Sequence, residues 1–254
     1  MLRITLLLTL VALACHAAPS SDDAAVEPLY RSVTIADYKT ALSQSKSLVN
    51  RQKGRIISKT VDKLINENPK KVMYFAYYLW NNGAQDIVKN YFPLPFRVIF
   101  SQLSVELYNK KYSMELKVTL STDSDNERGV YGDYSKVGAR ADWTFMVTEA
   151  ADEKVYFKVY NPSNNQYMKS GNSADGDNDR PIYASTNFDT FRHQWYLEPV
   201  MYNGDLLFYI FNREYNQPLK LGQFTDSDGD RRAYAHGGDP SGDPERFGWK
   251  MVRY

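Results

Sequence analysis

The chain has 254 residues, of which 43% are hydrophobic and 24% are charged, and its formal net charge is +1. These values are typical of a globular protein with one large domain or two of ordinary size, and they exclude a disordered chain, a collagen and a multi-span membrane protein. Two features depart from the average: aromatic residues make up 14% of the chain, whereas it has only one cysteine and three histidines.

The first 17 residues have the pattern of a secretory signal peptide. A short basic start, Met1–Arg3, precedes the apolar run Ile4–Ala14, and small residues then allow cleavage after Ala17. The run is shorter than the roughly 20 residues of a spanning helix, and no later segment is long and apolar enough, so we expect a secreted, extracellular protein with no membrane span. A lipidated Cys15 is the less favoured alternative, because the preceding leucine stands one place too late for that motif.

Cleavage after Ala17 would change the chemistry available to the protein. It removes the only cysteine and leaves 30 basic and 30 acidic residues. The secreted chain must then be stable without a disulfide, which favours large, well-packed cores. A net charge near zero also argues against nucleic acid as a partner, since phosphate binding needs a basic surplus.

Residues 18–103 are predicted to form an all-α helical bundle. Apolar residues recur there at spacings of three and four, which is typical of helices with one buried face. The Asn68-Pro69 pair predicts the start of a helix over Lys70–Trp80 that ends at Asn82-Gly83, and a shorter helix is expected over Ala84–Tyr91.

Residues 104–254 change to a period of two, which indicates strands, and they contain an internal repeat. An acidic turn of the pattern Asp-x-Asp-x-acid-Arg begins at Asp123, Asp175 and Asp226, at offsets of 52 and 51 residues. A tyrosine stands three residues beyond each arginine, at Tyr131, Tyr183 and Tyr234, and a tryptophan follows further along each unit, at Trp143, Trp195 and Trp249. Three units of about 50 residues are too few for a propeller and suit a closed pseudo-threefold barrel.

The predicted fold class is therefore an α+β two-domain protein, with an N-terminal helical bundle followed by a C-terminal β-trefoil. The charges divide at the same boundary. Residues 18–100 carry 12 basic and 7 acidic groups, whereas residues 101–254 carry 18 and 23. We expect the two halves to attract each other weakly across an interface.

The acidic turns resemble calcium loops at first sight, because hard cations prefer clustered carboxylates. An EF-hand loop needs glycine at its sixth position and glutamate at its twelfth, where the loop from Asp175 has Arg180 and Thr186. We expect the arginine to hold the neighbouring carboxylates, with no metal site and no cofactor, although weak cation binding stays open.

Two sets of residues are candidates for ligand contacts. Asp and Asn side chains accept sugar hydroxyls and tyrosine stacks on a sugar ring, so the sugar-binding candidates lie in and after the turns: Asp175, Asp177, Tyr183, Asp226, Asp228 and Tyr234. The segment Met73–Trp80 is hydrophobic almost all round its helix, which indicates either a buried helix or an apolar groove. The lipid or apolar-ligand candidates are Tyr74, Phe75, Tyr78, Leu79, Trp80, Phe92 and Phe96.

Catalytic motifs are missing from the sequence. It contains no Gly-x-Ser-x-Gly, no His-Glu-x-x-His and no Walker-type loop. His193 precedes Trp195 and His236 lies before a glycine pair, so both are expected to be structural. We therefore predict a protein that is not an enzyme, with converging carboxylates for glycoside chemistry as an open alternative.

The chain resembles the low-molecular-mass, thirty-kilodalton lipoprotein family of moth and silkworm haemolymph. The resemblance rests on Val61–Ile65, Tyr77–Trp80, Tyr91–Pro93, and the acidic turns with the tryptophans that follow them. It implies a fat-body product that is secreted into larval haemolymph, stored, and taken up by other tissues or eggs, with lipid and sugar association. The ricin-type Gln-x-Trp signature is missing, which argues against sugar binding of that type.

The leading hypothesis is a secreted haemolymph storage and carrier protein, lipid-associated and non-catalytic. The alternative is a carbohydrate-binding defence protein that recognises glucans through the acidic turns. Lipid or another apolar small molecule and sugars are the expected partners, and the sequence does not identify an uptake receptor.

Overall fold

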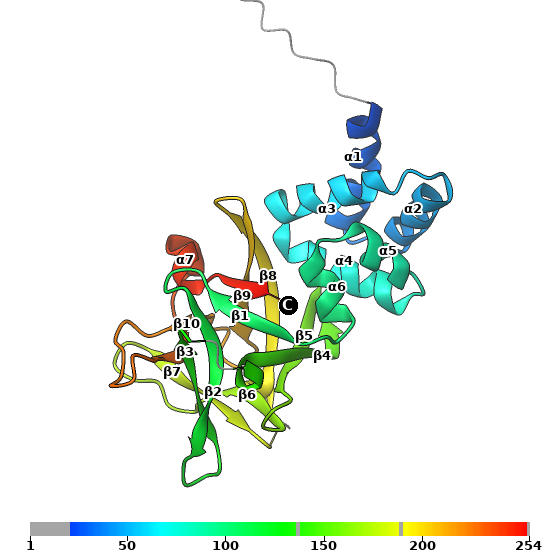
Figure 1. Ribbon diagram of the computed structural model, residues 1–254. Coiled ribbons are helices and arrows are strands. Elements are labelled where there is room, and N and C mark those ends of the chain that lie inside the picture. Colours follow the sequence, from blue (N-terminus) through cyan, green and yellow to red (C-terminus); the bar gives the residue numbers. More distant parts are fainter. Residues whose placement is uncertain (1–20, 136–137, 188–189, 253–254) are drawn as a thin grey trace, which may run out of the picture.

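The computed structural model describes residues 21–135, 138–187 and 190–252, so the predicted signal peptide, residues 1–17, lies outside the described part. Helices occupy one end of the molecule and strands the other (Figure 1). Six helices are described in the first hundred residues: α1 (Ser21–Thr34), α2 (Tyr38–Asn50), α3 (Arg55–Glu67), α4 (Pro69–Asn81), α5 (Gln85–Tyr91) and α6 (Leu94–Phe100).

The helices form where the apolar spacing predicts them. Helix α3 buries one continuous face, made of Ile56, Ile57, Thr60, Val61, Leu64 and Ile65. Helix α4 begins at Pro69, and Gly83, just beyond its end, has the left-handed φ of 69° that glycine adopts at low cost. Asn68 occupies the N-cap position but makes no capping hydrogen bond with its side chain, whose amide nitrogen donates to the Tyr30 hydroxyl.

The second half forms one twelve-stranded antiparallel sheet. Its strands are β1 (Val105–Asn109), β2 (Met114–Thr122), β3 (Arg128–Asp133), β4 (Asp142–Ala151), β5 (Lys154–Asn161), β6 (Gln166–Ser170), β7 (Asp179–Ser185), β8 (Gln194–Tyr202), β9 (Asp205–Asn212), β10 (Leu219–Leu221), β11 (Arg231–His236) and β12 (Trp249–Val252), with the short helix α7 (Pro244–Phe247) before the last. Pairing runs from β1 through β4, β5, β8, β9 and β12 back to β1, so the sheet closes into a barrel. The hairpins β2–β3, β6–β7 and β10–β11 meet one another through β3, β7 and β11.

The predicted β-trefoil is corrected by this architecture, which is a closed antiparallel β-barrel. The turns, the tryptophans and the order of strand pairing repeat three times, but the lengths of the strands and of their pairings do not. The corresponding strands β2, β6 and β10 have nine, five and three residues. The pairing between the first and last strand of a repeat also differs: β1–β4 pairs over two positions, β5–β8 over three, and β9–β12 over one, Trp249 with Phe208. The pairing register, which the repeat does not encode, therefore decides the form of this half.

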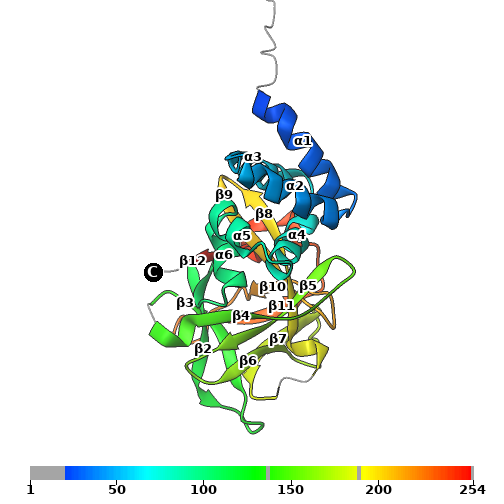
Figure 2. The same ribbon diagram turned by 90° about the vertical axis from the view of Figure 1, so that its right-hand side faces the viewer.

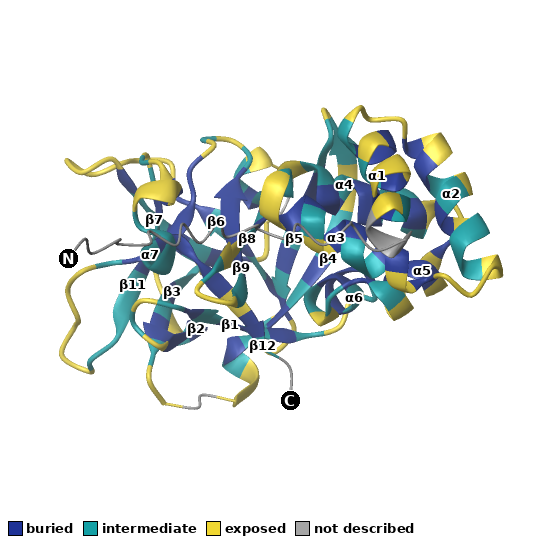
Figure 3. Cartoon of the chain, turned by 90° about the horizontal axis from the view of Figure 1, so that it is seen from above, coloured by how far each residue is buried: buried dark blue, intermediate teal, exposed yellow. Residues whose placement is uncertain are grey.

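The hydrophobic core continues from the helices into the barrel. Figure 2 shows the helices stacked on one end of the barrel, and Figure 3 shows buried segments in both halves. The Phe96 ring on α6 lies 5.8 Å from that of Phe208 on β9, and the Phe100 ring lies 6.2 Å from that of Phe157 on β5. The division into two folding units at residues 103 and 104 stays a prediction, and the continuous core indicates that the two halves pack as one body.

Ion pairs across this junction follow the predicted charge difference. Lys71 on α4 pairs with Glu153 in the turn between β4 and β5, and Lys70 lies 4.0 Å from Glu198 on β8. In both pairs the helical half supplies the cation and the barrel the acid. None of the helices in the described ranges has the length and apolar character needed to cross a membrane.

Candidate functional site

Each acidic turn is held by its first aspartate. Asp226 Oδ1 accepts hydrogen bonds from the backbone amides of Asp228 at 3.0 Å and Asp230 at 2.9 Å. The turns that begin at Asp123 and Asp175 repeat this arrangement. A carboxylate that accepts two amides fixes the turn without a cation.

The expectation that the arginine holds the neighbouring carboxylates is wrong. Arg231 Nη1 donates to the carbonyl oxygen of Gly222 at 3.1 Å, and Arg128 Nη1 donates to that of Thr119 at 3.2 Å. Arg180 reaches the carbonyl oxygen of Asn172 in the same way. The arginines thus tie each turn to backbone carbonyls in or just after the preceding strand.

A second charged set joins the repeats to one another. Lysines at the same spacing of 52 and 51 residues reach the last acid of a neighbouring turn: Lys117 to Asp230 at 2.6 Å, Lys169 to Glu127, and Lys220 to Asp179 at 2.7 Å. The Lys220 side chain is only 3% exposed, and burial lowers the pKa of its amino group. The sequence reasoning missed these lysines, although their spacing could have revealed them.

One pocket beside the turns brings three of the sugar-binding candidates together. Asp175 and Asp177 face Tyr234 in a polar pocket of about 430 Å³ that Lys220, Phe224 and Arg232 also line. The acids belong to the second repeat and the tyrosine to the third. This partnership arises because β7 and β11 pair, with Tyr234 opposite Pro181.

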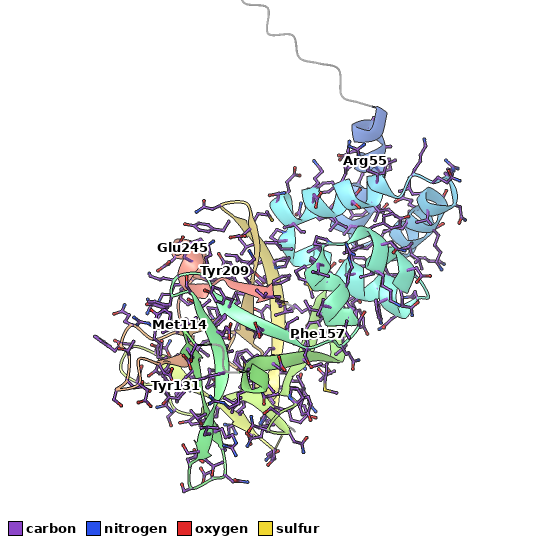
Figure 4. The ribbon with its side chains drawn as sticks, viewed as in Figure 1. Arg55, Met114, Tyr131, Phe157, Tyr209 and Glu245 are labelled. Atoms are coloured by element: carbon purple, nitrogen blue, oxygen red, sulfur yellow. The ribbon has the colours of Figure 1, made fainter. Side chains whose placement is uncertain are left out.

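A second pocket, of about 440 Å³, contains Asp226 and Asp228. Their aromatic partner is Tyr131 of the first repeat and not Tyr234. Figure 4 shows Tyr131 on the side of the barrel away from Arg55 and the helices. The structure therefore places the acidic candidates in two pockets, each completed by another repeat.

The remaining sugar-binding candidate, Tyr183, lines neither pocket. Its hydroxyl accepts a hydrogen bond from Arg232 Nη2 at 3.0 Å, and the Arg232 guanidinium also lies 5.4 Å from the centre of its ring. This tyrosine is therefore already engaged by the protein.

The two described histidines lie in different surroundings. His193 is 1% exposed, its Nδ1 lies 3.0 Å from the Thr190 hydroxyl, and burial lowers its pKa to about 4. His236 Nδ1 lies 2.6 Å from Asp179 at the edge of the first pocket. No cluster of three metal-ligating side chains occurs within the residues that the structure describes.

The apolar-ligand candidates lie in the helical half, on α4, at the end of α5 and on α6. Phe75, Leu79, Phe92 and Phe96 are each at most 1% exposed. The ring of Phe92 lies 5.6 Å from that of Phe75 and 5.7 Å from that of Phe96, so these side chains fill the space between the helices. The other three, Tyr74, Tyr78 and Trp80, pack against this core while staying partly exposed. Ligand contact at these positions stays a prediction.

Comparison with known proteins settles the family. Residues 23–253 match the lepidopteran low molecular weight (30 kD) lipoprotein family. The chain belongs to this family. The resemblance that the sequence predicted is thereby confirmed.

Relatives from two moths match along all or nearly all of their length. Microvitellogenin of Manduca sexta is 42% identical over all of both chains, and low molecular mass lipoprotein PBMHP-6 of Bombyx mori is 38% identical, also over all of both. Low molecular mass lipoprotein 3 of Bombyx mori is 36% identical over 92% of this chain and 91% of its own. Their names support a storage or lipoprotein role for the family.

Solved structures match only part of the chain. A Caenorhabditis elegans protein of unknown function is 11% identical, with a TM-score of 0.47 over 59% of this chain and 93% of its own. The designed threefold symmetric protein ThreeFoil is 18% identical, with a TM-score of 0.45 over 59% of this chain and 99% of its own.

Proposed function

We propose that the protein is a secreted, non-catalytic storage and carrier protein of the haemolymph that associates with lipid. The observation that carries the proposal is family membership over residues 23–253, with relatives named lipoproteins and microvitellogenin. A single core that continues through both halves supports it, since a stored protein must persist without a disulfide in the secreted chain.

The storage role is tested by following the protein through metamorphosis. A reserve is expected to accumulate in larval haemolymph and to fall as adult tissues or eggs are built. Quantitative immunoblotting of haemolymph and eggs measures both. A haemolymph level that stays constant while tissues form would contradict storage.

Lipid association is tested separately. Native mass spectrometry of protein purified from haemolymph, before and after solvent extraction, is expected to show a mass decrease of defined size. A mass equal to that of the bare secreted chain in both samples would contradict stoichiometric lipid binding. A signal peptide cut after Ala17 predicts that this chain begins at Ala18.

A second candidate function is recognition of glucans at the acidic turns. It is favoured by the two pockets in which exposed carboxylates face a tyrosine, Asp175 and Asp177 with Tyr234 in one, Asp226 and Asp228 with Tyr131 in the other. Carboxylates accept sugar hydroxyls, and an aromatic ring offers a face for stacking.

The glucan test needs variants that leave the turns intact. Asp175 and Asp226 hold their own turns, whereas Asp177 and Asp228 contribute backbone amides to them. The double variant Asp177→Ala/Asp228→Ala is therefore expected to lose binding on a glycan array without loss of stability. Asp125→Ala, at the equivalent place in the first turn, is the matched control. Absence of binding by the unmodified protein would reject this function.

A further inference from the structure

A third pocket lies where helix α4 meets the barrel, away from the acidic turns. It measures about 200 Å³ and is walled by Met73 of α4, by Val155 of β5 and by Tyr196 and Leu197 of β8. Met73, Val155, Tyr196 and Leu197 are each at most 5% exposed on the whole molecule. The pocket is thus an apolar recess between the two halves.

One carboxylate in this recess has no adequate partner. The side chain of Glu198 is 17% exposed, and its one polar contact within the described chain is Lys70 Nζ at 4.0 Å, which is too long for a hydrogen bond. Burial raises the pKa of this carboxyl above its usual value. The carboxylate is partly buried and accepts no hydrogen bond from a side chain within the described residues, so a donor that enters the recess can supply one.

The repeat shows that the barrel does not require an acid here. Glu198 stands three residues after Trp195, and the same place after Trp143 and Trp249 is taken by Met146 and Val252. Apolar side chains therefore serve in the other two repeats. An acid that replaces an apolar residue without stabilising the fold is the kind of exception that is expected at functional sites.

The charges around the recess already balance. Lys70, Lys71 and Lys154 line it together with Asp152, Glu153 and Glu198. Lys71 is paired with Glu153, and Lys154 Nζ lies over the Tyr196 ring, 4.1 Å from its centre. A charged ligand would upset this balance, whereas a neutral one with a single donor would satisfy Glu198.

We propose that this recess binds a small neutral amphiphile, a medium-chain alcohol or a molecule of that class, whose hydroxyl donates to Glu198 and whose apolar body contacts Met73 and Leu197. The volume is below the roughly 300 Å³ at which drug-sized pockets begin, so the ligand is smaller than a long-chain lipid. The site adds a ligand class to the carrier role and does not depend on storage. It is separate from the candidate residues Tyr74 and Trp80.

The test compares two isomeric probes, octan-1-ol and 1-methoxyheptane, which have the same atoms but differ in the hydroxyl donor. Protein labelled at its methionine methyl groups is titrated with each, and the Met73 resonance is followed by NMR after assignment through Met73→Leu. We expect both probes to move Met73, with the alcohol binding about tenfold more tightly, the effect of one hydrogen bond to a charged acceptor.

Substitution of the carboxylate isolates its role. Glu198→Leu is expected to abolish the preference for the alcohol while the ether still binds, and Glu214→Leu, an exposed control on the loop after β9, is expected to keep it. Glu198→Gln, which keeps one acceptor oxygen, should fall between them. If Glu198→Leu does not fold, the comparison of octan-1-ol with 1-methoxyheptane in the unmodified protein still tests the proposal.

Four results would overturn the proposal: an unmoved Met73 resonance at the solubility limit of octan-1-ol, equal affinities for the alcohol and the ether, an alcohol preference that survives in Glu198→Leu, or tighter binding of octylamine than of octan-1-ol. None of them bears on the depletion of the protein during metamorphosis. A failure of this site is therefore distinguishable from a failure of the storage role.

Discussion

The Tyr38 hydroxyl donates a hydrogen bond to Glu153 Oε1 over 2.8 Å, and this contact joins helix α2 to the turn between β4 and β5. Lys71 of α4 donates to the other oxygen of the same carboxylate. Asp152 and Glu153 both have left-handed φ values, 50° and 57°. The equivalent turn between β8 and β9 has Asn203 and Gly204 at these two positions, also with positive φ. A side chain is therefore retained at a position that favours glycine, which indicates that its contacts with the helices outweigh the strain.

Replacing Glu153 with glycine should separate these two effects. Glu153→Gly relieves the left-handed strain but removes both contacts, so amide exchange in α2 and α4 is expected to accelerate while the β4–β5 hairpin stays protected. Asp152→Gly relieves similar strain and leaves the contacts in place, so its helices should exchange as in the unmodified protein. Hydrogen exchange measured by mass spectrometry checks both. Unchanged protection of α2 and α4 in Glu153→Gly would refute the link.

The same carboxylate predicts a pH dependence at the acid end. The hydrogen bond from Lys71 lowers the pKa of Glu153 below its ordinary value of 4.5. Its stabilising contribution is therefore present above pH 4.5 and is lost as the pH falls through the lowered pKa of the folded protein. Thermal unfolding of the Glu153→Gln variant between pH 5 and 2 should show a shallower decline than that of the unmodified protein. Parallel curves would contradict this assignment.

His193 predicts a second pH dependence at milder acidity. Burial lowers its pKa from 6.5 to about 4, so its neutral form is favoured in the folded state. The contribution of His193 to the free energy of unfolding is fully present above pH 6.5. It decreases as the pH falls towards 4, by an amount on the order of 3 kcal/mol. Urea unfolding of His193→Gln, which cannot titrate, should lack this decrease. Direct NMR titration giving His193 a pKa near 6.5 would disprove the prediction.

Each barrel tryptophan donates a hydrogen bond to a strand of its own repeat. Trp143 Nε1 donates to the Leu116 carbonyl oxygen at 2.8 Å, Trp195 to that of Met168 at 3.0 Å, and Trp249 to that of Leu219 at 3.0 Å. Trp143→Phe removes this hydrogen bond and opens a void, so we expect a loss of roughly 2–4 kcal/mol in the free energy of unfolding. Urea unfolding with an unchanged m-value measures it. A loss below about 1 kcal/mol would argue against a stabilising role for the Trp143 hydrogen bond.

The acidic turns offer a matched pair of substitutions. Asp226 accepts two backbone amides, whereas no side-chain hydrogen bond within the described residues involves the carboxylate of Asp228. Asp226→Ala is expected to cost about 1 kcal/mol in the free energy of unfolding, and Asp228→Ala to change it by less than about 0.5 kcal/mol. Equal effects of the two substitutions would show that the turn is held in another way.

Much of the architecture was determined by local patterns in the sequence. Apolar residues at spacings of three and four predicted helices with one buried face, as α3 has, and Pro69 and Gly83 predicted the ends of α4. The repeat at Asp123, Asp175 and Asp226 predicted equivalent turns, because each turn is built from hydrogen bonds between residues at most four apart. The family resemblance rested on the same local segments.

Tertiary structure decided what depends on pairing between distant strands. The repeat led to a β-trefoil, whereas unequal strand lengths and the pairing register give a closed antiparallel barrel. The tyrosine that faces Asp175 is Tyr234 and not Tyr183, because β7 lies beside β11. Glu198 lies in a recess that forms only because α4 packs against β8. Local spacing fixes backbone turns and helix faces, but burial and electrostatic environment arise from neighbours that only the folded chain brings together.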